Sequence, residues 1–136
     1  MRFPEWLAVY GDQSFRGKCP AESVEQVTFF SRIRRQYPDT WGRLALHPRN
    51  EGDRTWQQTA RQKAEGMTPG ASDIIIPGAP TFVCEMKRLD HTKCKWQEGQ
   101  AEYLRSAHVA GSFVCVALGC NAAWEAFREW IDLQKK

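Results

Sequence analysis

Two carboxylates and an amine stand close together in the stretch from Gly70 to Lys87. Asp73 precedes three isoleucines, and Glu85 and Lys87 end a second apolar run that begins at Thr81. Apolar runs of this kind, separated by Pro and Gly, predict a tight antiparallel β-hairpin. Because side chains alternate along a strand, Glu85 and Lys87 share one face, and pairing around the turn brings Asp73 close to them.

This grouping of side chains has a chemical use. Two acids and an amine at the end of a buried hairpin are costly to remove from water unless they have a partner. Carboxylate oxygens are ligands that Mg²⁺ accepts. A cation held there acts as a Lewis acid and lowers the pKa of bound water, and phosphodiester hydrolysis needs both effects. The hairpin therefore predicts a metal site suited to that reaction.

A helix predicted over residues 21–36 comes before the hairpin and offers a third carboxylate. Its apolar face is formed by residues at helical spacing, namely Phe30, Ile33 and Tyr37. Extending that face backwards by one and two turns reaches Gln26 and Glu22, whereas Glu25 lies about 60° off the line. The spacing favours Glu22 as an inward acid. The competing interpretation is a first-turn acid that stabilises the helix dipole.

The other patterns predict a mixed α/β fold. They indicate a connection and short strand over residues 41–47, a polar helix from about Arg54 to Glu65 capped by Asp53, a helix from Thr92 to about His108, a strand over residues 112–118, and a last helix capped by Asn121 with Trp124, Phe127 and Ile131 inward. The hairpin's second strand, the next helix and the next strand form a parallel βαβ crossover. The predicted architecture is a mixed central sheet with helices on both faces.

Composition fits one globular domain. The chain has 136 residues, 42% hydrophobic and 26% charged, with a net charge of +3, which is compatible with nucleic acid without requiring it. No apolar run is long enough to span a membrane. Residues 1–19 are predicted to be an arm without assigned function, and residues 20–136 the functional domain.

The five cysteines form no CxxC pair. They are predicted to be free thiols in a reducing cytoplasm. His91 and Cys94 have no second pair at ligand spacing, so no zinc site is expected.

Six pieces of the sequence, from about Ala21 to the end, resemble the VRR-NUC branch of the PD-(D/E)XK nuclease superfamily. They are Glu22-x-x-x-Gln26-x-x-Phe29-Phe30, His47-Pro48-x-Asn50-Glu51-Gly52-x-Arg54, Lys63-Ala64-Glu65-Gly66-Met67, Gly70-x-Ser72-Asp73, Glu85-Met86-Lys87 and Gln97. One departure is Ser72, where the superfamily name expects proline. The resemblance implies a restriction-endonuclease-like core of the α/β (α+β) class.

The same resemblance implies roles at a metal site. Asp73, Glu85 and the backbone carbonyl of Met86 would coordinate Mg²⁺ or Mn²⁺, and Glu22 would complete or support the site. Lys87 would orient or deprotonate the attacking water, or stabilise charge building on the phosphate. Asp73, Glu85 and Lys87 are therefore each expected to be essential for cleavage.

Other matching residues would contact the site or the substrate. Gln97 would lean into the active site, while Gln26, Asn50 and Arg54 would hold nucleic acid or organise the loop around it. Small stand-alone members of the family are associated with phages and mobile elements.

Those members are also associated with branched DNA such as Holliday junctions or flaps, which places them in DNA repair. The expectation is a metal-dependent endodeoxyribonuclease acting on such DNA as a homodimer in a bacterial or phage-infected cytoplasm. The sequence leaves open whether the substrate is DNA or RNA. The alternatives are an inactive nucleic-acid-binding module of the same fold and a purely structural Glu85–Lys87 ion pair.

Overall fold

A four-stranded sheet forms the centre of the computed structural model, which describes residues 1–48 and 55–135. The strands, in the order β1-β4-β3-β2, are β1 (Ala8–Tyr10), β4 (Phe113–Leu118), β3 (Phe82–Lys87) and β2 (Ile74–Ile76). β2 and β3 pair antiparallel, whereas β3 pairs with β4, and β4 with β1, in parallel. The predicted hairpin, mixed sheet and parallel β3–β4 pair are confirmed.

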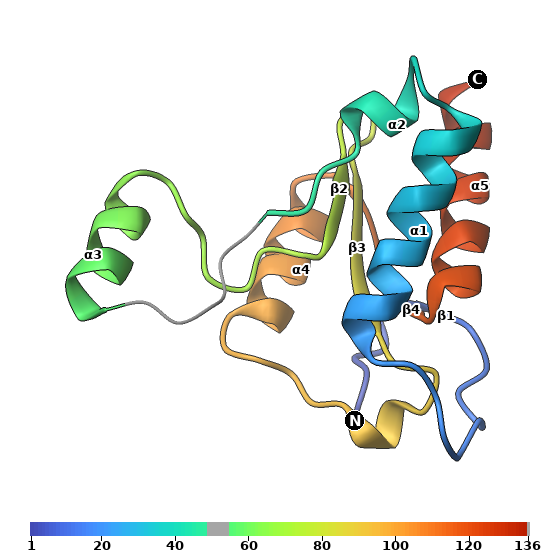
Figure 1. Ribbon diagram of the computed structural model, residues 1–136, viewed down its shortest axis with the longest axis horizontal. Coiled ribbons are helices and arrows are strands. Elements are labelled where there is room, and N and C mark those ends of the chain that lie inside the picture. Colours follow the sequence, from blue (N-terminus) through green and yellow to red (C-terminus); the bar gives the residue numbers. More distant parts are fainter. Residues whose placement is uncertain (49–54, 136) are drawn as a thin grey trace.

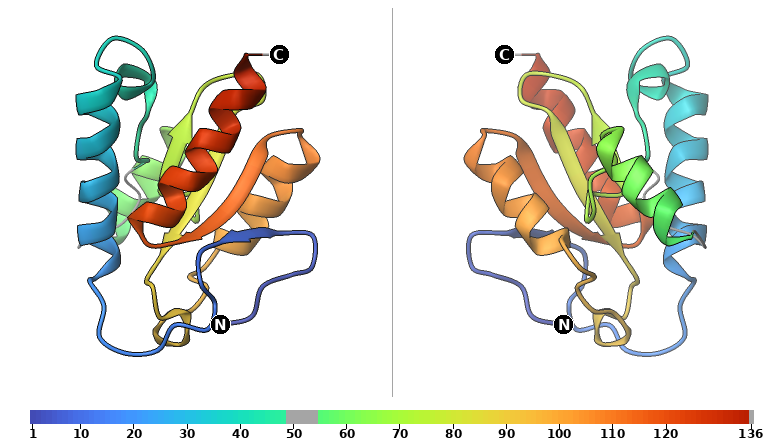
Figure 2. Two further views of the ribbon diagram at one scale, coloured as in Figure 1. Left: turned by 90° about the vertical axis from the view of Figure 1, so that its right-hand side faces the viewer. Right: turned by 90° about the vertical axis from the view of Figure 1, so that its left-hand side faces the viewer.

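Helices cover both faces of this sheet (Figures 1 and 2). They are α1 (Glu22–Gln36), α2 (Trp41–Leu44), α3 (Trp56–Ala64), the 3₁₀ turn η1 (His91–Lys93), α4 (Gln100–Val109) and α5 (Cys120–Gln134). α1 and α5 lie on one face and α4 on the other, while α3 stands away from the sheet (Figure 1). The predicted α/β class with flanking helices is confirmed.

Alternation along β3 separates two apolar cores. On the α1 and α5 side, Phe82, Cys84 and Met86 join one cluster, which includes the fully buried Phe127 of α5. On the opposite side, Val83 packs with residues of α4, β4 and the N-terminal segment. Glu85 and Lys87 follow Val83 in this alternation, so the sheet presents both toward the start of α4.

The strand predicted within residues 41–47 is wrong. These residues form α2 and then a single bridge between Leu46 and Ile75. Gly42 donates its N–H to the Tyr37 carbonyl, and a Cβ there would lie 2.6 Å from that oxygen. This glycine packs closely against the end of α1, and the chain there forms the short helix α2 where an extended strand was predicted.

The helix that follows β3 begins later than predicted. Asp90 accepts hydrogen bonds from the backbone N–H and the hydroxyl of Thr92, which confines helical structure there to the turn η1. The chain continues without regular structure until Gly99, whose φ of +85° precedes α4. Thr92 is therefore not the cap of a long helix: Asp90 caps the turn η1, and α4 begins only after Gly99.

Two other caps also differ from prediction. α5 begins directly after Gly119, with φ of +91°, so Asn121 lies inside the helix. Thr55 caps α3 through a reciprocal capping box with Gln58. The predicted cap at Asp53 lies outside the described residues. The inward positions of Trp124, Phe127 and Ile131 are confirmed.

The first residues of the chain contribute to the sheet. β1 pairs with β4 in the register Ala8 to Cys115, so this segment supplies an edge strand. Asp90 accepts the Gly17 N–H, and Lys93 donates to the Gly17 carbonyl. The segment that sequence patterns left without an element is thus bound to the loop after β3.

The five cysteines all carry free thiols, as predicted. Within residues 1–48 and 55–135, no helix has the length and apolarity required to cross a membrane.

Candidate active site

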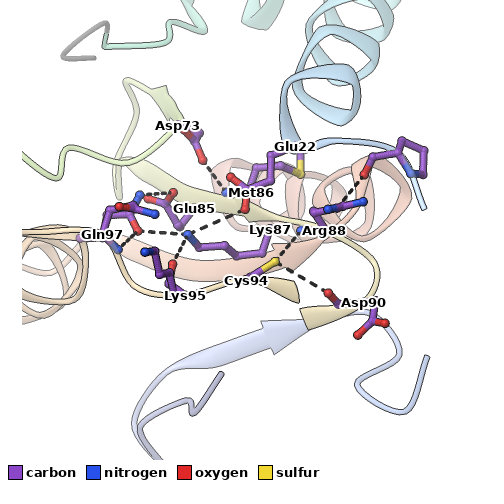
Figure 3. A network of polar contacts seen from close by, with 12 residues as sticks. Glu22, Asp73, Glu85, Met86, Lys87, Arg88, Asp90, Cys94, Lys95 and Gln97 are labelled. Atoms are coloured by element: carbon purple, nitrogen blue, oxygen red, sulfur yellow. Dashed lines mark hydrogen bonds and ion pairs between the residues drawn. The ribbon is translucent and has the colours of Figure 1, made fainter. Parts of the chain in front are cut away.

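The hairpin holds Asp73 against β3 (Figure 3). Ile74 pairs with Cys84, which places Asp73 next to Glu85 at the open end of the hairpin. Asp73 Oδ2 accepts the backbone N–H of Met86 at 2.9 Å. The carbonyl oxygen of Asp73 accepts a hydrogen bond from Nδ1 of His47, also at 2.9 Å. Both the side chain and the backbone of Asp73 are therefore fixed.

Lys87 is a buried ammonium group with defined partners. Its side chain is 1% exposed, and Nζ donates to the Lys95 carbonyl at 3.1 Å and to Gln100 Oε1 at 3.0 Å. Glu22 Oε1 of α1 lies 4.0 Å from the same nitrogen. These contacts hold the ammonium group beside Glu22 and Glu85, as Figure 3 shows.

The amide that connects these groups belongs to Gln100, which sequence analysis missed. Gln100 Nε2 donates to Glu85 Oε1 at 3.1 Å, while its Oε1 accepts from Lys87. That oxygen also accepts the backbone N–H of Gln97 at 2.8 Å. Gln97 lines a cavity next to these groups, but its side chain is exposed. The two glutamines are three residues apart. Because α4 begins at Gln100, it is the Gln100 side chain that reaches Glu85 and Lys87.

The carboxyl group of Glu85 is in an unfavourable environment for a charge. The residue is 1% exposed, and within the described part of the chain its Oε2 has no hydrogen-bond partner. Burial, followed by the adjacent Asp73 carboxylate, raises the pKa of Glu85 well above its usual value. At Glu22, burial also raises the pKa, although Lys87 opposes the shift. Burial and the neighbouring acids thus raise the pKa of Glu85 and Glu22 even with the Lys87 ammonium group beside them.

A cavity of about 440 Å³ opens beside these acids. Glu22, Asp73, Gln97 and Gln100 contribute to its walls, together with residues 69–71. The presence of an open space between α1 and the hairpin meets a basic requirement of the predicted site, since a substrate phosphate needs room next to the carboxylates.

One wall of the cavity is a close backbone contact. Gly70, with φ of +80°, lies directly against Gly99, and a Cβ at Gly70 would collide with the Gly99 carbonyl group. This contact holds the segment leading into β2 against the residue that precedes Gln100. Glycine is required at Gly70 by both its backbone conformation and its lack of a side chain.

The donor set fits a hard divalent cation. Among residues 1–48 and 55–135, no three His, Cys, Asp or Glu side chains are arranged as a ready metal cluster. The partnerless Glu85 Oε2 nevertheless lies beside the Asp73 carboxylate, and the Lys87 ammonium offsets the charge of this pair only in part. Mg²⁺ needs only one or two protein carboxylates and retains several waters, so this pair suits it.

The prediction for α1 was right about Glu22 and wrong about Glu25. Glu25 is 7% exposed and its Oε2 accepts the Cys120 N–H at the start of α5 at 3.3 Å. The apolar face also includes Phe29, one turn beyond Glu25, and the projection from Phe30 did not include it. Both acids therefore point inward, but Glu22 faces the cavity and Glu25 caps a helix.

The remaining predicted residues are less closely tied to the site. Gln26 is half-buried on α1, one turn beyond Glu22. Asn50 and Arg54 lie outside the described residues. Ser72, the departure from the superfamily pattern, is fully buried, and its hydroxyl has no partner among the described residues. It does not line the cavity, which agrees with a backbone role before Asp73.

A mixed sheet with helices on both faces, and acids at the end of its hairpin, defines a restriction-endonuclease-like α/β fold. A solved structure described as a VRR_NUC domain protein has this fold. It superposes with a TM-score of 0.65 at 19% sequence identity, over 88% of this chain and 93% of that chain. No protein-family model and no curated protein matches the sequence. The structural likeness supports the VRR-NUC resemblance indicated by the motifs.

Proposed function

We propose that the protein is a VRR-NUC nuclease that uses Mg²⁺ or Mn²⁺ to hydrolyse phosphodiester bonds in DNA. One observation carries this proposal: Glu85, buried and with a partnerless oxygen, lies between the buried Lys87 and Asp73, and Asp73 lines an open cavity. Burying these groups together is costly for the fold and is explained by a cation and a phosphate as their partners. The fold shared with a VRR_NUC domain protein supports the same conclusion.

The chain's own groups would divide the work. Asp73, Glu85 and the Met86 carbonyl would hold the cation, with Glu22 in support. The bound cation supplies a Lewis acid and a water of lowered pKa. Lys87 would direct its free N–H toward the attacking water or the phosphate. Gln100 fixes both Lys87 and Glu85 and so would act as a positioning residue.

Gln97 and Gln26 complete the proposed assignment at the edges of the site. Gln97 lines the cavity and would contact the reacting phosphate or its water. Gln26 would hold substrate from α1, and Asn50 and Arg54 would do so from the segment before α3.

The finer part of the proposal concerns substrate form. The protein would cleave branched DNA, such as four-way junctions or flaps, in preference to linear duplex. Symmetric cutting of a junction requires two active sites in fixed relation, so the active species would be a homodimer. Light scattering of the free protein and of its junction complex tests this: a monomer in both would contradict the dimer.

A cleavage panel tests the activity itself. Single strand, duplex, flap and four-way junction are each incubated with Mg²⁺, Mn²⁺ or EDTA, with matched RNA forms in parallel. The expected result is cleavage that needs metal, is strongest on branched DNA and is lost in Asp73→Asn. Binding without metal-dependent cleavage would instead identify the alternative, a catalytically inactive nucleic-acid-binding module.

A further inference from the structure

The helix α3 exposes an aromatic side chain without packing it on the protein. Trp56 is 83% exposed, more than any other large apolar side chain in the described ranges. None of the α3 side chains in those ranges is buried, and Figure 1 shows the helix standing clear of the sheet. The capping box at Thr55 gives this helix its own local support. The core therefore explains neither the position of Trp56 nor its residue type.

The chemistry of α3 favours a polar, negatively charged partner. Trp56, Ala60 and Lys63 share one face at i, i+4 and i+7 spacing, with the small alanine leaving the indole unobstructed. Arg61 lies about 140° around the helix from Trp56 and forms an ion pair with the exposed Glu65 at 3.8 Å, a surface pair of the kind that contributes little. With its glutamines and basic residues, this surface is too polar for a stable dimer core, which is depleted in charge.

The position of α3 connects it to the proposed active site. The chain leaves the helix and passes through residues 69–71, which form part of the cavity wall, before reaching Asp73. A nucleic-acid strand that leaves the cavity along this wall would meet α3. Aromatic side chains beside basic ones are the usual means of holding unpaired bases and their phosphates.

We propose that Trp56 is a stacking platform for an unpaired or displaced base of the substrate, with Lys63, on the same face of α3, contacting a neighbouring phosphate. This inference rests on the proposed function and adds that the recognised feature is a base outside the duplex stack. It gives the protein a reason to prefer distorted over linear DNA that does not depend on the catalytic groups.

Binding without cleavage tests the proposal. The full chain is titrated in EDTA into a duplex carrying one extrahelical 2-aminopurine and into the fully paired duplex, with anisotropy and 2-aminopurine fluorescence as readouts. Stacking on an aromatic ring is worth about 1–3 kcal/mol per base, so Trp56→Ala should weaken binding to the bulged duplex by about 5- to 150-fold. It should also abolish fluorescence quenching, while binding to the paired duplex changes little.

Two matched variants control the result. Trp56→Phe keeps a ring and should retain most of the affinity and quenching. Val109→Ala removes another exposed apolar side chain, 73% exposed at the end of α4, and should behave as wild type. Circular dichroism checks that each variant is folded.

Three outcomes would overturn the proposal. Equal binding of both duplexes by wild type and Trp56→Ala would remove the stacking role while leaving the nuclease assignment intact. A change of oligomeric state in Trp56→Ala would identify α3 as a contact between copies of the chain. Failure of the wild-type protein to bind any nucleic acid would overturn this inference and the proposed function together.

Discussion

The end of the β2–β3 hairpin and the helix α3 are opposites in how the protein holds them. Glu85 and Lys87 are each about 1% exposed; Glu85 accepts a hydrogen bond from Gln100, and Lys87 donates one to the Lys95 carbonyl. Trp56 is 83% exposed on a helix with no buried side chain among the described residues. The first region is fixed by the fold, whereas the second is fixed mainly by its own capping.

This difference separates two requirements of a nuclease. Charge stabilisation needs groups held in place before the reaction, since reorganising them would reduce the rate. Contact with a substrate of variable shape needs exposed groups that are free of core packing. If the proposed function is right, changes at the hairpin affect turnover, and changes at α3 affect binding.

The largest effect is expected from Glu85→Gln. Loss of a cation ligand removes several kcal/mol of transition-state stabilisation, so cleavage should fall by roughly 10³-fold. The free energy of unfolding of Glu85→Gln should instead increase. Because the pKa of Glu85 is raised in the folded protein, its carboxyl group favours the fold when protonated and loses that contribution as the pH rises through the folded pKa.

At neutral pH in EDTA, Glu85→Gln should therefore unfold at higher urea concentration than wild type. Glutamine imitates the protonated acid and can donate to Asp73. Unchanged cleavage would remove Glu85 from the active site, and lower stability would show that its buried charge is already compensated.

A smaller loss is expected from Gln100→Ala. Its amide orients Glu85 and Lys87 without being a proposed cation ligand, and such supporting contacts are worth about 10–100-fold in activity. Gln97→Ala is the matched control and should change single-turnover cleavage much less. A larger loss in Gln97→Ala would instead support the role that the family resemblance implied for Gln97.

Acid should loosen the contact between the N-terminal segment and the loop after β3. Hydrogen bonds from Thr92 and Gly17 lower the pKa of Asp90 from 3.8 to about 2. A lowered pKa means that this stabilisation is present above about pH 4 and is lost as the pH falls toward about 2. Asp90→Asn should destabilise the protein at neutral pH, and its difference from wild type in urea unfolding should shrink in acid. A constant difference would exclude this contact as the cause.

The smallest global effect is expected at the cap of α3. Thr55→Ala should weaken that helix by about 1 kcal/mol, seen as faster amide hydrogen exchange in residues 56–64. The free energy of global unfolding should hardly change, because α3 contributes nothing to the core. Phe127→Ala is the contrast: deleting this fully buried ring should cost about 3–5 kcal/mol globally. Equal global losses would mean that α3 is coupled to the core.

Local sequence patterns predicted the parts of the fold whose side chains repeat with one period. α1 and α5 follow from apolar residues at helical spacing, and the hairpin and β4 follow from short continuous apolar runs. β1 was missed because three residues carry no periodic signal and its pairing with β4 joins segments about a hundred residues apart. The role of Asp90 as a cap was missed because the more familiar signal at Thr92 stood two residues away.

The site was predicted to a similar extent. Spacing placed Asp73, Glu85 and Lys87 together. In the structure Asp73 and Glu22 line the cavity, and Glu85 and Lys87 are buried beside them. Spacing did not distinguish Gln97 from Gln100. The two are about one helical turn apart, so either could face the site until the first residue of α4 is known. His47 was included in a motif, but only the folded chain shows that it bonds the Asp73 carbonyl.

The contact between Gly70 and Gly99 has a mechanical consequence. It lies on the short path between α3 and Asp73, and both backbones there are too close for any side chain. If α3 moved together with a bound DNA strand, the movement would stop at this contact and would not displace the carboxylates. This pair of glycines would thereby let α3 change its contacts with a substrate while the catalytic carboxylates stay in place.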